Sequence, residues 1–187
     1  MRGSCQAPAA APCRAPTHEG RCPVPITVLV GNPKPKSRTL DAAVRLATRL
    51  GDGPPERVID VVELGPGLLG WGDPAVAEAV AQVRAAEVLV VASPTFKATY
   101  TGLLKLFLDQ IPSGGLAGVT AVPLMLGAGP AHALAPELLL KPVLVELGAH
   151  CPAQGLYQLD SSYAEDAALE EWLTRWRPHL VPAPRPA

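Results

Sequence analysis

Residues 88–105 read VLVVASPTFKATYTGLLK, and this stretch decides the fold. Its first part, residues 88–91, is continuously apolar and rich in valine, as expected for a strand that is covered on both faces. Pro94 ends the strand, and Gly102 lets the helix that follows lie close to a neighbouring element. A tight loop between such a strand and a helix is where an α/β sheet holds a ligand.

The same alternation of strand and helix extends along the chain in both directions. We expect strands at residues 26–30, 58–62, 88–92, 119–126 and 155–159, and helices at residues 39–50, 74–86, 100–111, 131–147 and 164–176. Five regular βα units predict a parallel sheet with right-handed crossovers and helices on both faces. The expected fold is therefore a flavodoxin-like, doubly wound α/β fold with five parallel strands in the order 2-1-3-4-5.

Length and composition fit one domain. The chain has 187 residues, 48% of them hydrophobic, which is enough to bury a full core. We assign this domain to residues 24–177. Residues 1–23 are rich in proline and alanine and are expected to form a flexible arm, and residues 178–187 a flexible proline-rich tail.

Charge and apolar patterning exclude several classes of function. The formal net charge is −1, which gives no electrostatic basis for binding nucleic acid or an anionic membrane. No apolar run reaches the ~20 residues of a membrane-spanning helix, and the N-terminus lacks a secretory core, so we expect a cytoplasmic protein. Cys5, Cys13 and Cys22 lie in the arm and Cys151 lies far from them, so no metal site is expected.

The expected helix at residues 131–147 is apolar nearly all the way round. A helix that lies on a sheet needs only one apolar stripe, whereas this one carries leucine or valine at most positions from 134 to 147. A second apolar face predicts contact between subunits, with extra burial inside one subunit as the alternative. We expect a homodimer or homotetramer that uses residues 134–147.

The loop after the first strand, residues 31–39, has the composition of a phosphate-binding loop. It contains two hydroxyls, three cations and a helix N-terminus, where backbone N–H groups and the helix dipole favour an anion. Ser37 and Thr39 can donate hydrogen bonds, and Arg38 can bind two oxygens at once. The loop matches neither the Walker A pattern nor the dinucleotide fingerprint, and a simple helix cap with solvated cations is the alternative.

Two more loops with unusual composition follow the third and fourth strands. Residues 94–97 offer an aromatic ring, a cation and backbone amides, and residues 127–132 contain two glycines and end in a histidine. Strands 1, 3 and 4 are neighbours in the expected sheet, so the three loops meet at its carboxyl edge. A phosphate pocket beside two loops that can hold a flat ring is what FMN requires.

These motifs resemble those of the NAD(P)H-dependent FMN reductases. The similarity spans residues 25–160 and is carried by residues 31–39, 94–109 and 127–144. It is greatest to the alkanesulfonate-type and chelator-degradation-type reductases of two-component monooxygenase systems. The resemblance implies hydride transfer from NADH or NADPH to FMN, and release of reduced FMN to a flavin-dependent monooxygenase as partner.

The resemblance also implies which residues hold FMN: 37–39 the phosphate, 94–97 the inner edge of the flavin and 127–129 its ring. His132 is expected to face the nicotinamide or an edge of the flavin, although alone it reads more simply as a helix-start residue. No catalytic acid or base is expected, because hydride transfer needs neither. The candidate cofactor-binding residues are Asn32, Ser37, Arg38, Thr39, Pro94, Thr95, Phe96, Lys97, Gly127, Ala128, Gly129 and His132.

Three positions depart from the family's pattern. Phe96 stands where the family usually has tyrosine, and Ala128 replaces the second glycine of a pair. In the alkanesulfonate-type enzymes an inserted tyrosine widens the next helix into a π-turn at the subunit contact; this chain keeps that length but has Leu138. Tighter retention of FMN is therefore an alternative.

Other functions stay open on sequence alone. One is an FMN-retaining reductase of quinones, azo dyes or metal ions, and another is a non-enzymatic electron carrier of the flavodoxin type. The carrier would need an acidic face, which a net charge of −1 does not favour. A third, an NAD-binding module that uses Glu63, lacks the glycine fingerprint.

Overall fold

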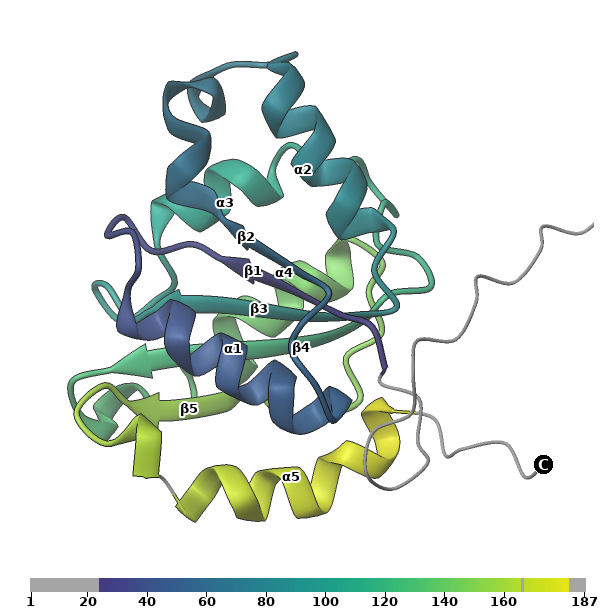
Figure 1. Ribbon diagram of the computed structural model, residues 1–187. Coiled ribbons are helices and arrows are strands. Elements are labelled where there is room, and N and C mark those ends of the chain that lie inside the picture. The colour runs from purple at the N-terminus through teal and green to yellow at the C-terminus, as the bar shows by residue number, and fades with distance from the viewer. Residues whose placement is uncertain (1–23, 166, 182–187) are drawn as a thin grey trace, which may run out of the picture.

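A parallel sheet organises the protein, which we describe from a computed structural model at residues 24–165 and 167–181. The strand order is β2-β1-β3-β4-β5, as the sequence predicts (Figure 1). The strands are β1 Ile26–Val30, β2 Arg57–Asp60, β3 Val88–Pro94, β4 Thr120–Gly127 and β5 Leu156–Leu159. The predicted arm at residues 1–23 and the predicted tail from residue 182 onward lie outside the described residues.

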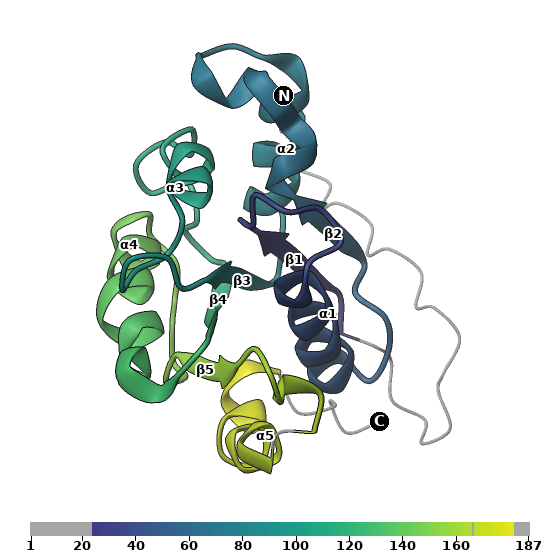
Figure 2. The same ribbon diagram turned by 90° about the vertical axis from the view of Figure 1, so that its left-hand side faces the viewer.

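Helices cover both faces of the sheet (Figure 2). On one face lie α1 Arg38–Gly51 and α5 Ala167–Leu180, and on the other lie α2 Pro74–Arg84, α3 Gly102–Leu108 and α4 Lys141–Glu146. Side chains alternate between the faces along each strand: Val28 and Val90 pack toward α1 and α5, whereas Leu29 and Val91 pack toward the other helices. The near-continuous apolar strands are explained by this double burial.

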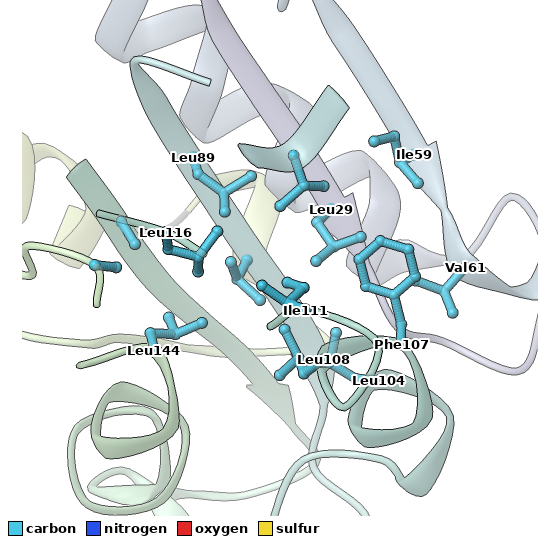
Figure 3. Packing of buried hydrophobic residues seen from close by; sticks show 14 of the residues in the cluster. Leu29, Ile59, Val61, Leu89, Leu104, Phe107, Leu108, Ile111, Leu116 and Leu144 are labelled. Carbon is cyan, nitrogen blue, oxygen red and sulfur yellow. The ribbon is translucent and has the colours of Figure 1, made fainter. Parts of the chain in front are cut away.

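The core on the α2–α3 side fixes where the site loops lie. Phe107 of α3 is fully buried beside Leu29, Ile59 and Val61 (Figure 3). At the start of this helix, the Thr101 hydroxyl donates to the carbonyl oxygen of Gly31 at 2.5 Å and accepts from the backbone N–H of Leu104. The N-terminus of α3 is thereby joined to the end of β1.

Three predicted elements, β2, α2 and α3, end earlier than expected. Strand β2 stops at Asp60, and residues 61 and 62 belong instead to a 3₁₀ segment, Val61–Leu69. Helix α3 is shorter than the predicted 100–111, because Thr101 caps its N-terminus and the chain turns after Leu108. These are boundary errors of the kind that periodicity alone does not prevent.

Two predictions about helices were wrong in more than their boundaries. The expected helix 131–147 is three pieces: a 3₁₀ turn at Pro130–His132, a π-helix at Pro136–Leu140 and α4. The expected tail from residue 178 is also wrong at its start, because α5 continues through Pro178 to Leu180. Burial of Leu180 and Val181 against the core compensates for the hydrogen bond that a proline removes from a helix.

Candidate functional site

A cavity of about 430 Å³ opens at the carboxyl edge of the sheet, where the loops after β1, β3 and β4 meet the end of β5. The strand arrowheads of β4 and β5 point to this edge, at the left of Figure 1. The lining residues are Asn32, Pro33, Lys34, Lys36, Ser37, Arg38, Thr39, Pro94, Thr95, Phe96, Leu126, Gly127, Ala128 and Asp160.

The β1–α1 loop is held in shape by its own side chains. The Asn32 amide donates to Thr39 Oγ1 at 3.0 Å and accepts from the backbone N–H of Lys34 at 2.9 Å. Ser37 is the N-cap of α1, and its Oγ accepts from the Leu40 N–H. Both hydroxyls act here as acceptors, so each keeps its own O–H free to donate into the cavity.

Arg38 reaches across the cavity mouth to the residue that follows β5. Its guanidinium donates to the carbonyl oxygen of Asp160 at 3.0 Å and forms an ion pair with the Asp160 carboxylate at 3.2 Å. The Arg38 side chain is 63% exposed and that of Asp160 is 31% exposed. A cation at a helix N-terminus, exposed on the cavity side, is available to a phosphate.

The loop after β3 forms a tight, closed turn. The backbones of Phe96 and Thr99 exchange two hydrogen bonds, and Lys97 and Ala98 between them have positive φ angles of 51° and 69°. This turn leaves the Phe96 ring half exposed at the cavity. Thr95 Oγ1 is buried at the cavity and has no hydrogen-bond partner among the described residues, so it is available to a ligand.

The loop after β4 lies close to Tyr157 of β5. A Cβ atom at Gly127 would overlap the Tyr157 hydroxyl, so a larger residue here would displace the Tyr157 side chain. The same hydroxyl donates to the carbonyl oxygen of Gly129 at 2.6 Å and fixes the loop. Residue 127 therefore presents bare backbone to the cavity.

The structure brings most of the predicted site residues together. The nine that line the cavity are Asn32, Ser37, Arg38, Thr39, Pro94, Thr95, Phe96, Gly127 and Ala128. Lys97, Gly129 and His132 are not among the lining residues. His132 instead lines a neighbouring hollow of about 380 Å³ with Ala98 and the π-helix leucines.

This neighbouring hollow is apolar and open to solvent. Leu134, Leu138 and Leu139 line it, and their side chains are 58%, 61% and 40% exposed. Leu138 lies within the π-helix, in agreement with the widened turn that the resemblance implies at this position. Val145 of α4 is exposed as well, whereas Leu140 and Leu144 on the inner side are fully buried.

The profile of the family "NADPH-dependent FMN reductase" matches residues 24–164. The chain belongs to this family. The match covers the whole sheet and all the loops that line the cavity. The predicted family and fold are thereby confirmed.

Individual relatives agree with the family match. The chain is similar to an "FMN reductase (NADPH)" of Escherichia coli, with 41% identity over 49% of this chain, and it spans about half of that relative's length, 48%. A protein of the same name from Pseudomonas aeruginosa is 29% identical over 75% of this chain and 80% of its own. The crystal structure of an apo NADH:FMN oxidoreductase, EMOB, superposes with a TM-score of 0.75 at 33% identity, over 86% of this chain and 92% of that one.

The residues at the cavity fit the flavin that gives the FMN reductase family its name. Free hydroxyls, a guanidinium and the α1 N-terminus suit the phosphate. The unpartnered Thr95 hydroxyl and the bare backbone at Gly127 lie at the other loops, where a planar ring needs close approach and hydrogen bonds.

Sequence reasoning missed Asp160 and Tyr157. The available signal was their place at the carboxyl end of the fifth strand, beside the fourth. Within residues 24–165 and 167–181, no cluster of three metal-ligating side chains occurs and no helix has the length and apolarity to cross a membrane.

Asp60 is a third missed residue, beneath the β1–α1 loop. It is 6% exposed, and within the described part of the chain neither carboxylate oxygen has a partner with hydrogen-bond geometry. Burial raises the pKa of this carboxyl, and the nearby backbone N–H groups of Val62 and Lys36 oppose the rise.

Proposed function

We propose that this protein is an NAD(P)H:FMN oxidoreductase that reduces FMN and supplies reduced FMN to a separate flavin-dependent monooxygenase. The observation that carries the proposal is the cavity where three loops converge, with a cationic, hydroxyl-rich end and an uncharged end of bare backbone. Family membership and the similarity to an NADH:FMN oxidoreductase support the same activity.

The residues of this chain bind FMN and orient its ring. Ser37, Arg38 and Thr39 hold the phosphate, and residues 94–96 with 127 and 128 flank the ring. FMN, when bound, supplies the site that accepts a hydride from the nicotinamide. Since no proton transfer to a side chain is needed, the residues contribute alignment of two rings and exclusion of water from between them.

The apolar hollow beside the cavity supports an oligomeric state. Its exposed leucines lie at the site edge, and a second subunit seated there would cover them and border the flavin. We propose a homodimer or homotetramer assembled through residues 134–147, with His132 near the nicotinamide.

Anaerobic mixing of the purified protein with FMN and either NADPH or NADH tests the activity. We expect the absorbance of oxidised FMN near 450 nm to fall. The turnover rate should be on the order of 1–1000 per second per site, the usual range for enzymes. A protein that binds FMN but leaves it oxidised with both nucleotides would contradict the proposal. The FMN-loaded protein is then passed through a desalting column. Loss of FMN on the column supports release of the flavin, and FMN that stays with the protein supports the FMN-retaining alternative.

A further inference from the structure

We propose that Asp160 limits how tightly the protein holds FMN, and so keeps the flavin exchangeable. The Asp160 carboxylate neutralises Arg38 and faces the phosphate end of the cavity. This inference rests on the proposed function, because it assumes that FMN occupies the cavity.

The Asp160 carboxylate lies at the phosphate end of the cavity, beside Arg38. Asp160 lines the same cavity as residues 37–39, and its side chain is directed to the Arg38 guanidinium at 3.2 Å. A carboxylate beside a phosphate dianion disfavours binding, since two like charges must share one partly solvated site. It also takes up hydrogen-bonding capacity of Arg38 that the phosphate would otherwise use.

Arg38 does not depend on the Asp160 carboxylate for its position. The guanidinium has two contacts with residue 160, one to the carboxylate and one to the backbone carbonyl oxygen at 3.0 Å. The backbone is fixed independently, because the Asp160 N–H donates to the Gly127 carbonyl oxygen at 3.0 Å. Removing only the negative charge therefore leaves Arg38 anchored beside the cavity.

Binding of the phosphate does not need the Asp160 carboxylate. Lys34 and Lys36 line the cavity and add positive charge, and Ser37 and Thr39 offer free O–H donors. A site built only for affinity would have no acid at its mouth. In a site that must release its flavin, an acidic side chain beside the phosphate speeds dissociation.

Asp160→Asn tests the inference, with FMN and riboflavin binding followed by quenching of flavin fluorescence. We expect FMN to bind on the order of tenfold more tightly and to dissociate more slowly, as removal of one like charge beside a dianion predicts. Riboflavin, which lacks the phosphate, should bind as it does to the unchanged protein, and the FMN gain should shrink at high salt.

Glu170→Gln is the matched control. Glu170 also pairs with an arginine of α1, Arg49, and the substitution changes the net charge equally, but the pair lies outside the cavity. It should leave both flavin affinities unchanged. Asp160→Asn added to Arg38→Ala gives a second measurement: a gain in FMN affinity should remain there, because the carboxylate then faces the phosphate without a neutralising partner, although the part of the gain that comes from freeing Arg38 is absent.

The outcomes separate the two proposals. Unchanged or weaker FMN binding by Asp160→Asn, an equal change for riboflavin, or loss of the gain in the Arg38→Ala background would overturn the role of Asp160 while FMN binding by the unchanged protein still stood. Absence of FMN binding by the unchanged protein would overturn both.

Discussion

The β1–α1 loop lines the cavity and the segment after β4 lines the neighbouring hollow, yet the first is held in shape by hydrogen bonds within the chain and the second leaves apolar side chains exposed. In the first, Ser37 and Thr39 are buried, and the Asn32 side chain bonds within the loop. In the second, residues 134, 138 and 139 expose apolar side chains around an open hollow. The two regions thus differ: polar contacts close the first, whereas the second leaves apolar surface uncovered.

The difference shows that polar and apolar parts of a site are prepared in different ways. A polar loop must satisfy its buried groups within the chain, because an unpartnered buried donor or acceptor is costly. An apolar surface leaves no hydrogen-bonding group unpaired while it is exposed, and its burial by a partner is favourable. The first region is therefore expected to respond to ligand changes, and the second to assembly changes.

Leu138→Asp should have the largest effect, because it tests the open region at its most exposed leucine. If a second subunit covers this face, an aspartate there buries an unpaired charge and breaks the oligomer. We expect a smaller species in sedimentation, unchanged far-UV circular dichroism, and weaker FMN binding, because this segment borders the site. Leu69→Asp, at another exposed leucine away from the hollow, is the control.

An unchanged sedimentation coefficient in folded Leu138→Asp would place the interface elsewhere. If Leu69→Asp dissociates the protein just as well, the open hollow has no special role in assembly.

Gly31→Ala tests the closed region and should cost about 3 kcal/mol of unfolding free energy, the upper part of the usual range for overpacking. An added Cβ would overlap Leu104 Cβ and lie 2.8 Å from its Cα, so helix α3 must shift. Denaturant unfolding measures the loss. Gly129→Ala is the counterpart after β4: no heavy atom lies within 4 Å of its added Cβ, and its stability should be unchanged. Equal losses would remove the contrast between the two regions.

The sequence predicted the sheet, its order and the three site loops because these follow from local patterns. Valine-rich strands, helix periods and loops with glycine, proline and charge each lie within one short window. The broken helix at residues 130–146 was missed because leucines alone do not show where the hydrogen-bond register changes, although the resemblance indicated a widened turn at Leu138.

The contacts that complete the site could not be predicted, since they join distant positions. Arg38 and Asp160 are 122 residues apart, and the Tyr157 hydroxyl reaches the carbonyl oxygen of Gly129 across two strands. The sequence around one residue of each pair does not indicate its distant partner. The pairing of β5 with β4 brings Tyr157 to Gly129, and the order of the whole sheet, with α1 packed on it, brings Arg38 to Asp160.

Arg38→Ala should weaken FMN binding by about tenfold while riboflavin binding changes little, since the lost contact is a charge-assisted hydrogen bond to phosphate. The effect stays moderate because the side chain is mostly exposed and already paired with Asp160. Fluorescence titration with both flavins checks this. Arg49→Ala removes a similarly exposed arginine of α1 outside the cavity and should change neither affinity. Equal losses for the two flavins would contradict a role in phosphate binding.

Ser37→Ala should have the smallest effect. It should lower both the free energy of unfolding and the affinity for FMN. The Ser37 hydroxyl caps α1 by accepting from Leu40, so its loss should cost about 1 kcal/mol of unfolding free energy. Loss of its O–H donor should weaken FMN by less than Arg38→Ala does, because a neutral hydrogen bond is replaced in part by water. Ser37→Thr keeps both functions of the hydroxyl and should restore both quantities. If Ser37→Ala lowers stability but leaves FMN affinity unchanged, the residue is a helix cap alone, and the closed loop binds phosphate through Arg38, Thr39 and its backbone.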